Sequence, residues 1–197
     1  MKQINITRDS SGNVTFETVS IDVTENVFFT NQDPDEAHWP TLATNQLGTY
    51  PSPNSSQCTV PTPDNLTPPN NQVTYGCQLH DNEQGIINVF AQLAAATTDL
   101  AQATKGKPIT RQQVVEGGMS PYAISGQIYQ VTDSNGNVIK SGTGSIGPGL
   151  SLSASTNSDG IWVSGTPTMS GTYNFTFTVN DAMGRNLQQV QYSMVVA

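Results

Sequence analysis

Near the middle of the 197-residue chain runs the stretch Tyr75-Gly76-Cys77-Gln78-Leu79-His80-Asp81-Asn82-Glu83-Gln84-Gly85. It contains one of the two cysteines of the sequence and, three residues later, one of its two histidines. The other histidine, His38, lies well before this stretch. A thiolate together with two imidazoles is a ligand set suited to copper. The pattern therefore predicts a metal site with His38, Cys77 and His80 as its ligands.

Segments with the alternation of β-strands surround this stretch. Val19, Ile21 and Val23 alternate with polar residues, the period of a strand with one buried face. We expect further strands at 3–8, 14–16, 26–31, 73–77 and 85–91. Residues 39–71, in contrast, hold seven prolines and almost no periodicity. They predict one long irregular segment, and loops of such length usually have a function.

The composition favours an all-β protein. Only 11% of the residues are charged, while Gly, Pro, Ser, Thr and Asn are plentiful, which suits short strands and turns better than helices. The net charge of −8 belongs to the first half: residues 1–93 hold ten acidic residues against two basic ones, and residues 94–197 hold five of each. This distribution argues against nucleic acid as a partner. No apolar run approaches the roughly 20 residues that span a bilayer.

Residues 94–107 separate two β-rich regions. The segment is rich enough in alanine for a short helix, which two threonines weaken and Gly106 and Pro108 would stop. We expect it to be a linker between a domain at 1–93 and a second domain at 108–197. In the second region, strands are expected at 123–132, 138–141, 160–164, 172–180 and 186–196.

Two spacing patterns mark residues 1–93: Phe29-x-Asn31-x-Asp33 at the end of a predicted strand with His38 soon after it, and Tyr75-x-Cys77-x-x-His80 with Gly85 five residues later. Both patterns resemble those of the cupredoxins, the family of small copper-binding proteins that includes plastocyanin, amicyanin and pseudoazurin. In that family the second pattern is Tyr-x-Cys-x-x-His-x-x-Met-x-Gly before the last strand. The resemblance implies a Greek-key β-sandwich in which His38, Cys77 and His80 are the equatorial copper ligands. It also implies that Asn31 ties the two ligand loops together.

The chain departs from the family at the axial ligand position. Where the pattern has methionine, this sequence has Glu83, with Gln84 beside it. A carboxylate oxygen is harder than a thioether sulfur and favours Cu(II), so the departure implies a lower reduction potential and a redder site. Glu83 matches the position by spacing, and an amide ligand from Gln84 is the alternative. A site with three ligands would also function.

Three segments of residues 108–197 combine glycine-containing turns with strand-like runs: Gly147–Leu152, Gly160–Pro167 and Ser170–Asp181. Through these segments, residues 108–197 resemble the Ig-like domains common in bacterial surface proteins. It implies a second β-sandwich that acts as a spacer or contacts other proteins or surface polymers. This half contains no histidine or cysteine, and we expect no enzyme activity, because an oxidase or nitrite reductase needs more histidines than the chain has.

Two functions remain open from the sequence. In the first, the chain is an exported copper protein, periplasmic or extracellular with its leader removed, that transfers single electrons to a redox partner protein. In the second, it is a non-redox surface or interaction protein, in which a metal-free cupredoxin scaffold is closed by a Cys58–Cys77 disulfide. Two cysteines in an exported protein often pair in this way.

Overall fold

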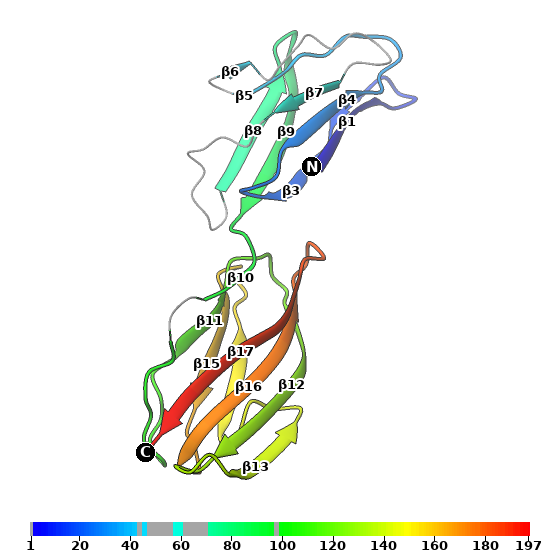
Figure 1. Cartoon of the computed structure of the whole chain (residues 1–197). Coiled ribbons are helices and arrows are strands. Elements are labelled where there is room, and N and C mark those ends of the chain that lie inside the picture. Colours follow the sequence, from blue (N-terminus) through cyan, green and yellow to red (C-terminus); the bar gives the residue numbers. More distant parts are fainter. Residues whose placement is uncertain (1, 43–44, 47–56, 61–70, 97–98) are drawn as a thin grey trace. The chain divides into compact units, whose positions relative to one another are not determined.

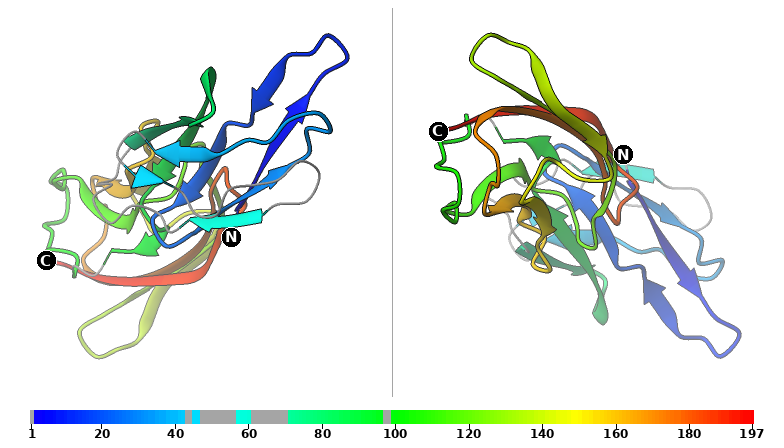
Figure 2. Two further views of the ribbon diagram at one scale, coloured as in Figure 1. Left: turned by 90° about the horizontal axis from the view of Figure 1, so that it is seen from above. Right: turned by 90° about the horizontal axis from the view of Figure 1, so that it is seen from below.

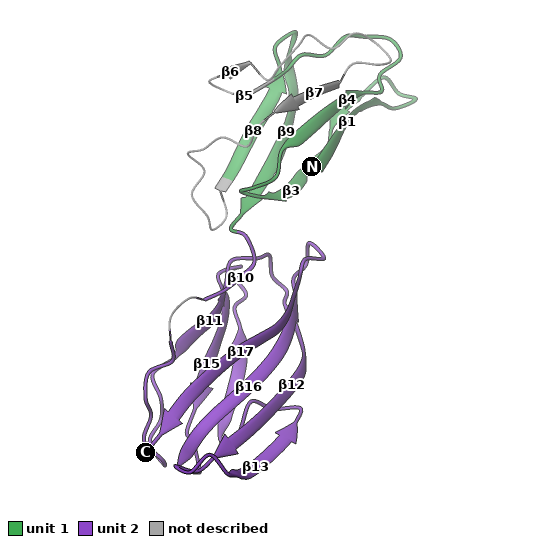
Figure 3. Cartoon of the chain, in the orientation of Figure 1, with its two compact units in different colours: residues 1–91 green, residues 92–197 purple. Residues whose placement is uncertain are grey.

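The computed structural model describes residues 2–42, 45–46, 57–60, 71–96 and 99–197. The chain divides into two compact units, residues 1–91 and residues 92–197 (Figure 3). All regular structure in the described residues is β-strand, arranged in four sheets (Figure 1). The prediction of an all-β protein is therefore confirmed. No helix in the described part of the chain is long and apolar enough to cross a membrane.

Unit 1 contains two sheets of mixed strand direction. The first has the order β2-β1-β4-β7, with β2 (Val14–Phe16), β1 (Lys2–Arg8), β4 (Val27–Asn31) and β7 (Gln57–Val60). The second has the order β3-β9-β8-β5-β6, with β3 (Val19–Asp22), β9 (His80–Phe90), β8 (Asn71–Cys77), β5 (Pro40–Leu42) and β6 (Asn45–Gln46). Strand β1 is parallel to β4 and β3 is parallel to β9, while the other pairs are antiparallel. The chain crosses from the first sheet to β3 and back to β4, as in a Greek-key sandwich.

Apolar side chains from both sheets share the core of unit 1. Every second residue of β4 is buried, which is the period expected of a strand with one face on the core. The core comprises Ile4, Ile6, Phe16, Val19, Ile21, Val27, Phe29, Tyr75, Cys77, Ile87 and Val89. One of the candidate metal ligands, Cys77, thus belongs to this core.

The proline-rich segment 39–71 contains strands that the sequence does not predict. Strand β5 pairs with the end of β8, and β7 pairs with β4. A proline at the first position of a strand, as Pro40 is in β5, removes no hydrogen bond from the interior of the sheet. The alternation signal fails here because these short strands lie among prolines and other turn-forming residues, with no longer periodic run around them.

Unit 2 is a second sandwich of two antiparallel sheets (Figure 2). One has the order β10-β11-β15-β14, with β10 (Ala94–Ala95), β11 (Gln112–Glu116), β15 (Gly160–Gly165) and β14 (Leu150–Ala154). The other has the order β13-β12-β16-β17, with β13 (Val138–Thr143), β12 (Ala123–Thr132), β16 (Gly171–Asn180) and β17 (Asn186–Val196). The bounds of β12, β13, β15, β16 and β17 agree with the predicted strands to within two residues, whereas β10, β11 and β14 are not among the strands that the sequence predicts.

Aromatic side chains of β16 form the centre of the unit 2 core. Tyr173, Phe175, Phe177 and Val179 are buried, and the residues between them are partly exposed. A glycine turn allows β14 and β15 to approach each other closely. Gly165 has a φ of 127°, and a Cβ atom there would lie 2.2 Å from the carbonyl oxygen of Gly149. Only glycine fits this position without moving the backbone.

The described residues of the predicted linker, 94–96 and 99–107, pack as part of unit 2 and not as a separate connection. Ala94 and Ala95 form β10 and pair with β11, and Ala103 forms a bridge with Val196. Leu100 and Ala103 are buried in the unit 2 core. Residues 92–96 and 99–107 contain no helix, because these contacts with the sheets outweigh the helix propensity of alanine. The boundary between the units lies after Ala91.

Candidate metal centre

The hairpin between β8 and β9 brings Cys77 and His80 together. Cys77 ends β8, His80 begins β9, and only two turn residues separate them. The pairing register shifts here: Cys77 lies opposite His80, whereas Gly76 lies opposite Gln84. Residues 81–83 therefore form a bulge. In a regular strand, His80 and Glu83 would point to opposite faces, and the bulge lets both side chains reach Cys77.

Four donor atoms converge at this hairpin. Nδ1 of His80 lies 3.5 Å from Sγ of Cys77 and 3.1 Å from Oε2 of Glu83. Nδ1 of His38 lies 2.8 Å from the same Glu83 oxygen. All four ligand atoms lie within 4.8 Å of one another. Atoms bound about 2.0–2.3 Å from a tetrahedral ion are roughly 3.3–3.7 Å apart, so these side chains fit one metal ion after small movements.

The backbone of Trp39 connects the two segments that carry the ligands. Its N–H donates to Sγ of Cys77 at 3.3 Å, and its carbonyl oxygen accepts from the Gln78 N–H at 2.8 Å. The side chain of Asn31 donates to the Glu36 carbonyl oxygen and accepts from the Asp33 N–H, both at 2.9 Å. Among the described residues, these hydrogen bonds of Asn31 shape the loop that leads to His38.

The ring nitrogen of His38 that points away from the other donor atoms faces a buried carboxylate. The His38 side chain is fully buried, and its Nε2 lies 2.7 Å from Oδ2 of Asp33. Arg8 donates to the Asp33 carboxylate through Nε and Nη2 at 2.9–3.1 Å, and it also contacts Glu36 at 2.6 Å. The Arg8 hydrogen bonds hold the pKa of Asp33 well below its usual range, so Asp33 is ionised.

Arg8 is not among the site residues that the sequence predicts. It ends β1 and lies 25 residues before Asp33, which follows β4, so no local spacing connects the two. The available signal was compositional: Arg8 and Lys2 are the only basic residues among the first 93. A lone arginine among ten acidic residues is a candidate partner for a buried carboxylate.

Cys77 is a free thiol with 7% of its surface exposed. Burial raises the pKa of this thiol, and the Trp39 N–H opposes the rise. A metal binds the thiolate, so binding would release the thiol proton. Because Cys77 is free, the structure does not contain the Cys58–Cys77 disulfide of the alternative hypothesis. Cys58, in β7, pairs through its backbone with Phe29 of β4, and its side chain lies outside the described residues.

Glu83 and Gln84 differ in their relation to the ligand cluster. The Glu83 side chain is 15% exposed and contacts both histidines, while Gln84 is exposed to solvent. Of the two axial candidates, Glu83 is therefore the one whose oxygen lies among the other donor atoms.

Tyr75 and Gly85 support the hairpin without contributing a ligand. Tyr75 is buried, its hydroxyl donates to the Glu17 carbonyl oxygen at 2.6 Å, and its ring packs 5.0 Å from that of Phe29. A Cβ atom at Gly85 would lie 2.4 Å from the Tyr75 ring. The large and the small residue thus form one packing unit across β8 and β9.

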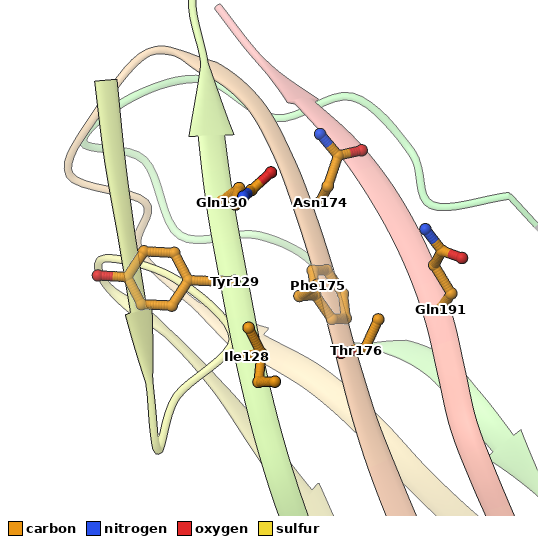
Figure 4. Close-up of a pocket in the computed structure, with 7 residues that line it drawn as sticks. All are labelled: Ile128, Tyr129, Gln130, Asn174, Phe175, Thr176 and Gln191. Carbon is orange, nitrogen blue, oxygen red and sulfur yellow. The ribbon is translucent and has the colours of Figure 1, made fainter. Parts of the chain in front are cut away.

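Unit 2 offers a shallow hollow of about 160 Å³ over strands β12, β16 and β17 (Figure 4). Amide side chains of Gln130, Asn174 and Gln191 and the 52%-exposed Ile128 line it. Its lining carries no charged or metal-binding side chain. Asp181, a conceivable cation ligand, instead accepts hydrogen bonds from Met119, Met183 and Arg185. It is a structural residue of its turn.

The fold of unit 2, two antiparallel sheets around one aromatic core, is that of an Ig-like β-sandwich. The chain belongs to the family described as "Putative Ig domain", whose model matches residues 95–197. The predicted Ig-like domain is thus confirmed, with a start 13 residues earlier than expected. A comparison with curated proteins finds no match.

Solved structures show only distant similarity to the chain. A multicopper oxidase aligns over 99% of this chain and 88% of its own, with 9% identity and a TM-score of 0.31. The fibronectin(III)-like modules of Clostridium thermocellum CbhA align over 91% and 89%, with 8% identity and a TM-score of 0.30. A Cu-containing nitrite reductase from Thermus scotoductus aligns over 99% and 61%, with 9% identity and a TM-score of 0.27. Similarity at this level assigns neither a site nor an activity.

Proposed function

We propose that unit 1 binds a single copper ion through His38, Cys77, His80 and Glu83, and that the protein transfers single electrons. The observation that carries the proposal is the convergence of one sulfur, two imidazole nitrogens and one carboxylate oxygen within 4.8 Å. A bound copper ion would supply one-electron redox chemistry, and the side chains would hold its coordination nearly constant. The cupredoxin-like sequence pattern independently supports the same ligands.

The surroundings of the cluster suit electron transfer better than catalysis. With only two histidines, the chain lacks the ligands for a second copper site of this type, and we propose that it is not an enzyme. Leu79, next to His80, has 41% of its surface exposed and offers an apolar contact for a redox partner. The acidic excess of residues 1–93 favours a partner with basic charge. We further propose that the protein is exported, because low charge and an Ig-like unit are typical of exported proteins.

The test is a titration of the metal-free protein with Cu(II), followed by visible absorption. We expect one equivalent to produce a thiolate-to-copper charge-transfer band. Cys77→Ser should abolish the band, while the matched substitution Cys58→Ser should retain it. If the parent protein shows no such band, or if Cys58→Ser loses it as fully as Cys77→Ser, the proposal is wrong.

A further inference from the structure

The contacts of His38 with Asp33 and of Asp33 with Arg8 form a series that leads from the buried side of the candidate metal centre towards the surface of unit 1. Each residue comes from a different segment: Arg8 ends β1, Asp33 follows β4, and His38 precedes β5. Asp33 and His38 are both fully buried, and Arg8 is 17% exposed. The imidazole lies between Asp33 at Nε2 and the other ligand atoms at Nδ1.

Hydrogen-bond rules determine which nitrogen of the His38 imidazole carries a proton. An ionised carboxylate only accepts hydrogen bonds, so the ring nitrogen that faces Asp33 must carry a proton. In a metal-bound imidazole the other nitrogen, Nδ1, then presents its lone pair towards Cys77, His80 and Glu83. A carboxylate bonded to the outer nitrogen of a histidine ligand also fixes the ring orientation and raises its basicity.

Arg8 stabilises the ionised form of the buried Asp33 carboxylate. An ionised Asp with no exposed surface is costly unless it is paired and hydrogen-bonded. The planar guanidinium meets Asp33 through two nitrogens, a geometry that lysine cannot reproduce. Arg8, which also contacts Glu36 at 2.6 Å, therefore offsets part of the charge that Asp33 would otherwise place near the metal.

We propose that Asp33 and Arg8 are positioning residues of the metal centre: Asp33 selects Nδ1 as the ligand atom of His38, and Arg8 offsets the charge of Asp33. The inference about metal binding rests on the proposed function, whereas the inference about the His38 proton does not. The two parts can therefore be tested separately on the full chain.

The first test uses the metal-free protein and ¹⁵N NMR of its two imidazoles. We expect a proton on Nε2 of His38 that exchanges slowly with solvent, because this side chain is fully buried. In Asp33→Asn, that proton should exchange faster and its resonance should move upfield, since the charged acceptor is lost. The control Asp35→Asn removes the same charge two residues away, at a side chain that is 69% exposed and lies 3.8 Å from Arg8 without contacting His38, and it should change neither property. An unprotonated Nε2 in the parent protein would overturn the assignment of Nδ1.

The second test measures metal binding, with Zn(II) as a redox-inert probe and Cu(II) for the potential. Asp33→Asn should weaken Zn(II) binding about 10–100-fold, while Asp35→Asn should change it less than about threefold. The copper reduction potential should rise in Asp33→Asn and fall in Arg8→Gln, because the two variants leave opposite uncompensated charges. The reduction potential of Arg8→Lys, which keeps the positive charge, should stay close to that of the parent protein.

The outcomes separate the two proposals. A potential that moves in the same direction in Asp33→Asn and Arg8→Gln would show a merely structural role and overturn the charge compensation. If the parent protein binds neither metal, the proposed function fails, and the imidazole spectrum of the metal-free protein alone decides the positioning of His38.

Discussion

At the scale of single residues, Glu83 determines which copper chemistry the proposed site supports. Its carboxylate lies 2.8 Å from His38 Nδ1 and 3.1 Å from His80 Nδ1, and with Cys77 it gives the site two anionic ligands. Two negative charges and two neutral imidazoles balance a divalent ion and leave a monovalent one with excess negative charge. The arrangement therefore favours Cu(II) over Cu(I) and predicts a low reduction potential.

Replacing Glu83 with methionine should reverse this preference. The soft thioether stabilises Cu(I), so we expect the copper reduction potential of Glu83→Met to rise and its charge-transfer band to shift towards the blue. Voltammetry and visible absorption of the copper-loaded protein measure both effects. Gln84→Ala is the matched control and should leave the potential unchanged. If Gln84→Ala shifts the potential and Glu83→Met does not, Gln84 is the axial ligand.

The residues of the site differ in how far the sequence predicts them. His38, Cys77, His80 and Glu83 can be selected because two of the three kinds of side chain are rare in this chain and fall on one spacing pattern. The roles of Arg8 and Trp39 cannot be predicted in this way. Arg8 acts through a contact between distant segments, and Trp39 acts through its backbone, which every residue type possesses.

At the scale of elements, the β8–β9 hairpin is the structure that brings Cys77, His80 and Glu83 together. Its bulge aligns two side chains that a regular strand would separate, and the packing of Tyr75 on Gly85 lies two residues beyond it. The hairpin thus needs both an irregular register at its tip and a close approach of its strands.

A methyl group at Gly85 should disturb this hairpin. In Gly85→Ala, the new Cβ would overlap the Tyr75 ring, and overpacking of this kind costs about 1–3 kcal/mol of unfolding free energy. Urea unfolding of the full chain measures the change in the transition of unit 1. Asn82→Ala, at an exposed position of the same hairpin, should stay within about 0.5 kcal/mol of the parent. Equal stability of Gly85→Ala and the parent would contradict the packing that we describe.

Alternation predicts the long strands of the chain well and the short ones poorly. Strand β16 shows four buried residues in strict alternation, and its bounds follow directly from the sequence. Strand β5 is too short to show a period and begins with proline, while β10 is two alanines whose pairing depends on β11. Such elements form because a neighbouring strand offers hydrogen bonds, and a single sequence does not reveal which neighbour that is.

At the scale of the whole molecule, the two units have separate cores and different charge. All four donor atoms, together with Arg8 and Asp33, belong to residues 1–91, and the acidic excess of the chain lies there as well. Unit 2 is a neutral Ig-like sandwich with no histidine or cysteine. The proposed redox function is therefore assigned to unit 1, and unit 2 is proposed as a spacer or a contact surface for other proteins or surface polymers.

The central claim is that the full chain holds one copper ion by the sulfur of Cys77 and the imidazoles of His38 and His80. X-ray absorption at the copper edge of the Cu(II)-loaded protein tests it most directly, because sulfur and nitrogen ligands scatter differently. We predict one sulfur and two imidazole nitrogens in the first coordination shell, at one copper per chain. A first shell of nitrogen and oxygen alone would contradict the claim.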